Sequence, residues 1–202
     1  MLKTNVTVLS IVNDSVALGG LALTNATSNF AVGVGYQALS ALTTGDGNTA
    51  VGYRSLASLT TGSRNTAFGY ESSFLLITHG DNASFGYQAL RNNLVSQISA
   101  FGYQALTANT TGTNNSSFGY QALNSNTSGI NNTAFGNLAL RNNNTGNDNS
   151  AFGYLALASN TTGSRNAAFG NEALRGNTIG SQMAAFGYQA LASNTSGTGN
   201  NA

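Results

Sequence analysis

The sequence has no cysteine, no proline and no tryptophan, and it carries little charge of either sign. Without cysteine, the chain can form neither a disulfide framework nor a thiolate metal site. Charged residues make up only 6% of its 202 residues, against about 25% in an average globular protein. The formal net charge of +1 provides no attraction to nucleic acid or to an anionic membrane, so neither is expected as a partner.

Long hydrophobic runs are absent as well. No stretch approaches the ~20 apolar residues that span a membrane, so we expect no membrane insertion. The opening MLKTNVTVLSIVND contains one lysine and a short apolar patch broken by polar residues, which is a poor match to a signal peptide. The apolar content of 41% is enough for a core, and its combination with low charge argues against disorder.

One repeated phrase dominates the sequence instead. A glycine preceded by an aliphatic or aromatic residue recurs at every sixteenth or seventeenth position. These marker glycines are Gly19, Gly35, Gly52, Gly69, Gly86, Gly102, Gly119, Gly136, Gly153, Gly170 and Gly187. We number each repeat from its marker, so that position −1 precedes the glycine and position +4 is the fourth residue after it. A second glycine stands at position +10 in most repeats; Gly80 stands one residue late, which predicts a one-residue insertion in ESSFLLITHG.

The length of this period decides the predicted fold. It is too short for two-helix repeats of about 33–47 residues and for propeller blades of about 40. It fits one coil of a parallel β-solenoid, in which short strands joined by tight turns stack about 4.8 Å apart. We therefore predict an all-β β-roll or β-helix of about eleven coils in residues 14–202, with a cap or lead-in segment in residues 1–13.

The largest apolar residues recur at positions −1 and +4, and they are the predicted core. Neighbouring side chains of an extended segment point to opposite faces, and the neighbours of position −1 are glycine, alanine or serine. We therefore expect the bulky residue to fill the coil interior and the small ones to face outward. The predicted core residues are Phe68, Phe85, Phe101, Phe118, Phe135, Phe152, Phe169 and Phe186, with Leu106, Leu123, Leu140, Leu157, Leu174 and Leu191.

Asparagine and tyrosine also recur at fixed positions. Asparagine at positions −4 and +7 is typical of turns, and its amides can form hydrogen-bonded ladders along a stack. We expect position +7 to be half-buried, because Leu42 and Leu59 replace asparagine there. The tyrosines follow the marker glycines and predict either an exposed ladder on which glycans stack or a packed wall between chains. They are Tyr36, Tyr53, Tyr70, Tyr87, Tyr103, Tyr120, Tyr154 and Tyr188.

Two phrases resemble repeats of known fibrous proteins. NTAFGNLAL, NTAFGYESS and, most closely, the stretch Ser15-Val16-Ala17-Leu18-Gly19 resemble the head repeats of trimeric autotransporter adhesins. The longer repeated phrase NTAFGYQALxxNTTG is similar to repeat arrays in bacterial, phage and giant-virus fibre proteins. The resemblance implies three chains that form left-handed parallel β-rolls about a threefold axis. It also implies an extracellular rod on a virion, phage tail or bacterial surface. Two features depart from the adhesin family: its common spacing is shorter than the spacing here, and no coiled-coil stalk or membrane anchor is present in this sequence.

No residue pattern predicts catalysis, a cofactor or a metal site. His79 lies in the corner ITHG without the partners that a catalytic or metal-binding role needs. The acidic residues are scattered over different repeats, and no pair recurs as the carboxylate dyad of a glycosidase. Arginines at shared positions, such as Arg64 with Arg165 and Arg91 with Arg141, predict a sparse basic stripe, either a solvated edge or a contact for acidic sugars.

Three functions remain open. The first is a non-enzymatic structural or adhesive fibre segment, a spacer rod or attachment device that pairs with itself as a homotrimer and binds a host-surface glycan or protein. The second is a self-assembling extracellular filament with subunits stacked head-to-tail; residues 200–202 begin a further phrase, which fits either open stacking or a fragment of a longer fibre. The third is an ice-binding solenoid, since Thr-Thr pairs recur, although other residues interrupt them.

Overall fold

Each repeat adds one short strand to a single sheet. The computed structural model describes residues 9–12 and 14–202, so residues 1–8 and 13 of the predicted lead-in segment lie outside the described residues. The first two strands are β1 (Leu9–Val12) and β2 (Ser15–Leu18), and each later strand spans three residues. These are β3 (Val32–Val34), β4 (Thr49–Val51), β5 (Thr66–Phe68), β6 (Ala83–Phe85), β7 (Ser99–Phe101), β8 (Ser116–Phe118), β9 (Thr133–Phe135), β10 (Ser150–Phe152), β11 (Ala167–Phe169) and β12 (Ala184–Phe186).

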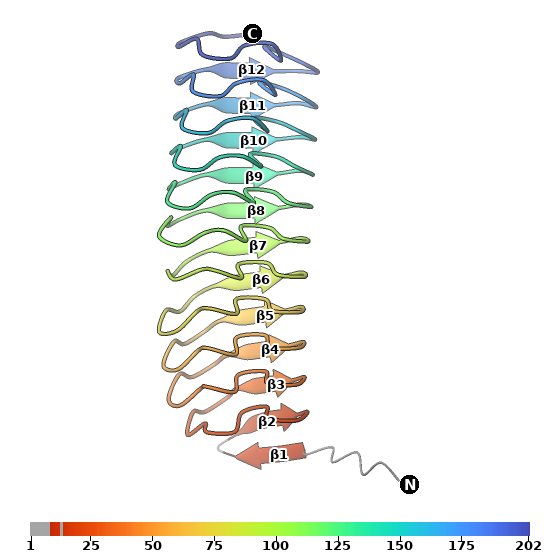
Figure 1. The fold of residues 1–202 in the computed structure, drawn as a ribbon, viewed down its shortest axis with the longest axis vertical. Helices are drawn as coiled ribbons and strands as arrows, with labels where there is room; N and C mark the ends of the chain where they lie inside the picture. Colours follow the sequence, from red (N-terminus) through yellow and green to blue (C-terminus); the bar gives the residue numbers. More distant parts are fainter. Residues whose placement is uncertain (1–8, 13) are drawn as a thin grey trace, which may run out of the picture.

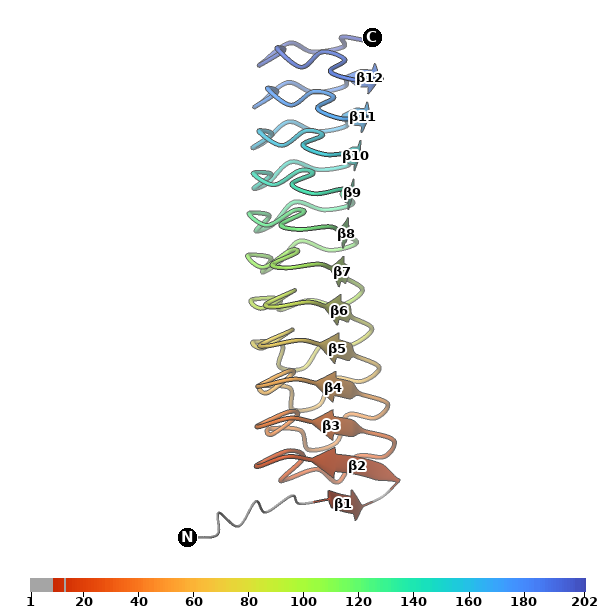
Figure 2. The same cartoon turned by 90° about the vertical axis from the view of Figure 1, so that its right-hand side faces the viewer.

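The order of the strands in the sheet follows their order in the sequence, so every coil lies on the one before it. Strands β2 to β12 are parallel and pair at equivalent positions, as Phe135 pairs with Phe152. Strand β1 is the exception, because it pairs antiparallel with β2 on the side away from β3. The stack forms a long rod with the strands along one side (Figures 1 and 2). The prediction of an all-β parallel solenoid is confirmed, with ~17 residues per coil.

The turn after each strand depends on left-handed backbone conformations. The marker glycines have φ between 127° and 146°, and positions +2 and +4 also have positive φ, as in Gln121 at 51° and Leu123 at 52°. The N–H of Ala122 donates to the carbonyl oxygen of Gly119 at 3.3 Å, which closes the first turn. This succession of turns, rather than a helical turn or a bent strand, swings the leucine at position +4 into the interior.

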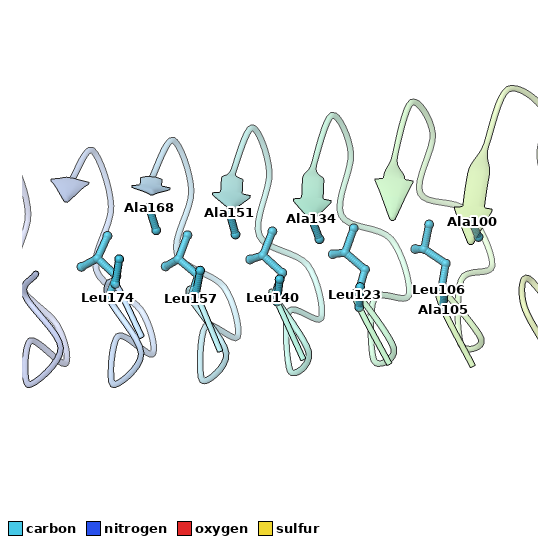
Figure 3. Packing of buried hydrophobic residues seen from close by; sticks show 14 of the residues in the cluster. Ala100, Ala105, Leu106, Leu123, Ala134, Leu140, Ala151, Leu157, Ala168 and Leu174 are labelled. Carbon is cyan, nitrogen blue, oxygen red and sulfur yellow. The ribbon is translucent and has the colours of Figure 1, made fainter. Parts of the chain in front are cut away.

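Alanine and leucine build the apolar interior (Figure 3). Alanine at positions −2 and +3 and leucine at position +4 are fully buried in most coils. Among the predicted core leucines, Leu106, Leu123, Leu140, Leu157 and Leu174 are fully buried and Leu191 is half-buried. Burial of one leucine contributes roughly 1.5–3 kcal/mol, and the coils share this contribution because each leucine packs between its neighbours along the rod.

The prediction that phenylalanine at position −1 fills the interior is wrong. The strand alternates as expected, but alanine at position −2 points inward and the ring points outward. The coil is too narrow for a ring: a Cβ on Gly33, at position −2, would already lie 3.1 Å from Leu23 Cγ and 3.2 Å from the carbonyl oxygen of Ala38. Among the phenylalanines at position −1, the exposed ones are Phe68, Phe135, Phe169 and Phe186, and the half-buried ones are Phe85, Phe101, Phe118 and Phe152.

Two ladders of asparagine amides complete the interior. At position +7, the Nδ2 atoms of Asn109, Asn126 and Asn143 each donate to the Oδ1 of the asparagine one coil earlier, at 2.8–3.0 Å. At position −4, Asn132 and Asn149 repeat the pattern at 3.2 Å and 3.1 Å. The predicted ladders are confirmed. The expected half-burial of position +7 is wrong, because these three amides are fully buried and find their partners in adjacent coils instead of water.

The late glycine Gly80 does not lengthen its coil, so the predicted insertion is wrong. Thr66 of β5 pairs with Ala83 of β6, at the same sequence separation as Thr49 and Thr66 in the preceding pair of strands. The carbonyl oxygen of His79 accepts from Asn65 Nδ2 at 3.0 Å, the contact that the carbonyl of Gly62 makes with Asn48 in the preceding coil. His79 therefore occupies the corner position that glycine has in most other coils.

We predict that Gly119→Ala destabilises the rod by at least about 2 kcal/mol. The new Cβ would overlap the carbonyl group of Gly136 in the next coil, and alanine would also have to adopt a φ of 139°. Gly187→Ala is the matched control, because Gly187 has a φ of 128° and no atom lies within 4 Å of the place that its Cβ would take. Urea unfolding of both variants separates the steric effect from the conformational one; equal losses would contradict the close approach of the coils.

We predict that Asn143→Leu destabilises the rod by about 2 kcal/mol or more, although leucine occupies the same position in Leu42 and Leu59. The change leaves Asn126 Oδ1 and the carbonyl of Gly146 without the Nδ2 donor of Asn143. Asn137→Leu, at an exposed position, should change the free energy of unfolding by less than about 0.5 kcal/mol. Similar effects in urea unfolding would show that the ladder contributes little.

Candidate interaction surface

Two rows of aromatic rings run along the outside of the rod, and together we call them the aromatic stripe. Phenylalanine at position −1 forms one row and tyrosine at position +1 the other, on either side of the marker glycines. The structure places all eight predicted tyrosines on the surface, with exposed fractions from 40% to 72%. Position −3, the third outward position, holds only valine, threonine, serine or alanine. The strand face is therefore free of charge along the sheet from β2 to β12.

Rings of successive coils stack on one another within each row. Tyrosine ring centroids from Tyr36 to Tyr120 are 5.0–5.6 Å apart with interplanar angles of at most 15°. Phenylalanine centroids from Phe68 to Phe118 are 4.7–5.0 Å apart. Offset stacking of this kind is favourable beyond the burial of ring area. Because each ring covers the face of the next, the stripe presents ring edges and tyrosine hydroxyls to a partner, and the stacked rings offer no free face to a sugar.

The regular stacking is interrupted in the coil of Gly136. Asn137 replaces tyrosine there, and Phe135 lies 6.2 Å from Phe152 and is tilted by 31° against Phe118. Phe135 is 54% exposed, whereas the adjacent phenylalanines are half-buried. Asn171 interrupts the tyrosine row a second time. The stripe therefore consists of a continuous segment up to Phe118 and Tyr120, followed by a less regular one.

A polar ladder runs beside the tyrosines at position +2. Glu71 is nearly buried; its carboxylate accepts from Arg91 Nε at 2.7 Å and from Gln88 Nε2 at 3.1 Å, and it lies 3.7 Å from Arg54. The guanidinium groups of Arg54 and Arg91 lie over the ring of Phe74, at 4.4 Å and 5.4 Å from its centroid. We call Arg54, Glu71, Phe74, Gln88 and Arg91 the Glu71 bracket.

The electrostatics of this ladder follow from its contacts. Burial raises the pKa of Glu71, but the hydrogen bonds from Arg91 and Gln88 and the charges of Arg91 and Arg54 outweigh it, so the net shift of the pKa is downward. Burial and the charge of Glu71 raise the pKa of the neighbouring Tyr70. The Glu71 bracket was not among the residues predicted from the sequence, although Arg54, Glu71 and Gln88 follow one another at the spacing of the repeat.

The remaining charged residues do not form a continuous basic stripe. Arg64 binds Asp81 with two hydrogen bonds of 2.6 Å and 2.9 Å at the surface, and Arg175 pairs with Glu172 at 3.3 Å. The hydrogen bond from Arg64 lowers the pKa of Asp81. His79 is exposed at its corner. Within residues 9–12 and 14–202, no group of three or more histidine, cysteine, aspartate or glutamate side chains could hold a metal ion.

Comparisons with protein-family models, with curated proteins and with solved structures found no match. In the part of the chain that the structure describes, no helix is long and apolar enough to cross a membrane.

We predict that the stability difference between the wild type and Glu71→Gln depends on pH. Because the pKa of Glu71 is lowered in the folded state, its stabilising contribution is complete above the pKa of the unfolded chain and is lost as the pH falls through the folded-state pKa. Urea unfolding from pH 7 to pH 2.5 should show the wild type more stable at neutral pH and the difference vanishing in acid.

Asp81→Asn is the control for a solvent-exposed ion pair. Its partner Arg64 is 71% exposed, so solvent screens the pair and the stability difference should be small at every pH. A pH-independent effect of Glu71→Gln, or an equal effect of Asp81→Asn, would contradict a specific role of the buried carboxylate.

Proposed function

We propose that this chain is a non-enzymatic structural rod, a segment of an extracellular fibre on a virion, phage tail or bacterial surface. The observation that carries the proposal is the aromatic stripe, which follows the long axis of the rod. Contiguous exposed apolar surfaces larger than a few hundred Å² mark interaction sites on soluble proteins. A stripe that follows the long axis fits a partner that is itself long and apolar.

Our proposal is that this partner is the chain itself, arranged as a homotrimer in which three stripes face one axis. Rotational symmetry about an axis parallel to the rod would bring equivalent coils to the same height, so that stacked rings of one copy meet stacked rings of the next. Uncharged positions −3, −1 and +1 support close contact, because no charge has to be desolvated there. The less regular segment around Phe135 and Asn137 is available for a host-surface protein or glycan.

The observations weigh against the two alternative functions. A head-to-tail filament that continued the parallel stack would have to pair with β2, but the antiparallel strand β1 already occupies that edge. An ice-binding face needs threonine hydroxyls that are free to order water. The hydroxyls of Thr43, Thr110 and Thr161 at position +8 instead donate to a backbone carbonyl of the next coil, at 2.9–3.0 Å.

We predict that the wild type forms trimers at micromolar concentration and that Tyr103→Glu weakens their association by at least about 30-fold. Tyr103 lies within the continuous part of the stripe and is 42% exposed, so a charge there would be buried in the trimer while the fold remains intact. Multi-angle light scattering over a concentration series measures the association, and circular dichroism checks the fold. The control Thr111→Glu places the same charge at an exposed position outside the stripe. A wild type that stays monomeric at about 100 µM would overturn the trimer.

A further inference from the structure

The interior of the rod is divided in two. Buried apolar residues form one cluster from Ala31 to Leu76 and a second from Ala89 to Ala185. Where the two clusters meet, Ser72, Ser73 and Ser84 occupy successive interior positions, +3, +4 and −2, which alanine and leucine fill in most other coils. Ser73 is the only residue other than leucine at position +4 in the whole array.

The hydroxyl groups of the three serines form hydrogen bonds with one another inside the otherwise apolar core. Ser84 Oγ lies 2.7 Å from Ser72 Oγ and 2.9 Å from Ser73 Oγ, and Ser72 Oγ also donates to the carbonyl of Ser84 at 3.2 Å. The coil of Gly69 therefore lacks the leucine that packs between its neighbours elsewhere. Loss of a buried leucine side chain removes a large part of the energy that couples adjacent coils of a solenoid.

The asparagine ladders are also interrupted near this coil. Position +7 changes from leucine in Leu76 to asparagine in Asn93, so the first amide ladder begins only above the serines. The second ladder runs from Asn48 to Asn82 and is broken at Ile98, where only a backbone N–H continues it. Every interior column therefore changes within residues 72–98, which we call the joint.

The contacts that cross the joint lie on the outside of the rod. The Glu71 bracket connects three successive coils through Arg54, Glu71 and Arg91. The phenylalanine and tyrosine stacks also continue past the joint without a break. Inside, backbone hydrogen bonds such as that from Ser73 N to the carbonyl of Ala89 at 2.9 Å hold the coils together with the amide of Asn82, whose Nδ2 donates to Asn65 Oδ1 and to the carbonyl of Val95 at 3.1 Å.

We propose that the rod consists of two cooperatively folding units that meet at the joint, that the Glu71 bracket couples them, and that the rod opens first at this place. In a solenoid, each coil contacts only its neighbours, so the weakest interface limits how far cooperativity extends. The joint would allow one part of a long fibre to yield under load while the rest stays folded. This inference goes beyond the proposed function and does not depend on the trimer.

Hydrogen–deuterium exchange of the full chain, read by mass spectrometry, tests the proposal. After correction for the intrinsic exchange rate of each amide, we expect amides of the joint to exchange at least about tenfold faster than amides at the same coil positions elsewhere, such as Ser73 compared with Leu123. Both amides donate to the equivalent carbonyl of the next coil, at 2.9 Å and 3.1 Å, so the hydrogen bond itself does not explain a difference. Uniform protection from residue 31 to residue 185, or a minimum in another coil, would overturn the proposal.

Two variants test the cause. The triple change Ser72→Ala, Ser73→Leu and Ser84→Ala gives the joint the same residues as Ala89, Leu90 and Ala100, and should slow exchange there to the level of the other coils. Glu71→Gln should accelerate exchange at the joint at least about threefold and separate the unfolding of the two units. Ser55→Ala and Ser117→Ala are matched controls, because these buried serines occupy positions +3 and −2 in coils that retain leucine.

The controls should leave the exchange of the joint unchanged. If the triple variant does not fold, the wild-type profile and Glu71→Gln still decide the question, because both are measured on chains with the native interior. If Glu71→Gln leaves exchange at the joint unchanged, the Glu71 bracket does not couple the two units. If a folded triple variant leaves it unchanged, the serines are not the cause of a weak interface and the proposed joint is wrong.

Discussion

The whole structure depends on the direct approach of one marker glycine to the next. A Cβ at Gly86 or Gly153 would overlap the carbonyl of the following marker, so only glycine allows the coils to stack this closely. That approach fixes the register of the strands, and the register in turn aligns every other position of the repeat with its equivalent. Each leucine at position +4 therefore packs next to the leucines of adjacent coils, and each buried asparagine amide lies next to the asparagine amide of the adjacent coil. The coil of His79 shows how strong the constraint is, because a displaced corner glycine changes the corner but not the length of the coil.

The sequence is sufficient to predict the solenoid, because the spacing of the glycines requires each coil to repeat the last. It also predicts the inward leucines and the amide ladders. It does not predict which face of the strand is inside. Alternation places phenylalanine and the neighbouring alanine on opposite faces, but it does not say which of the two points inward. The narrow cross-section at Gly33 decides that question, and it depends on the path of the turns. The Glu71 bracket was visible in the spacing of Arg54 and Glu71, which matches the repeat, but its burial was not.

The resulting distribution of side chains is the reverse of the distribution in a typical globular protein. Hydrogen-bonded amides lie in the centre together with small aliphatic groups, and most of the aromatic rings lie outside. A narrow interior that excludes rings leaves them only the surface, where they stack along the axis. The same constraint that makes the rod thin therefore gives it a cohesive apolar side, and this side is the basis of the proposed assembly into a fibre.

The amide ladders also give the rod a direction. In the position +7 ladder, the Nδ2 of each asparagine from Asn109 to Asn177 donates to the Oδ1 of the asparagine in the coil before it. The side-chain dipoles are therefore aligned, as the peptide dipoles are in an α-helix. Their sum points along the axis with its positive pole toward β1. A rod with a net charge of only +1 thus has two electrically different ends.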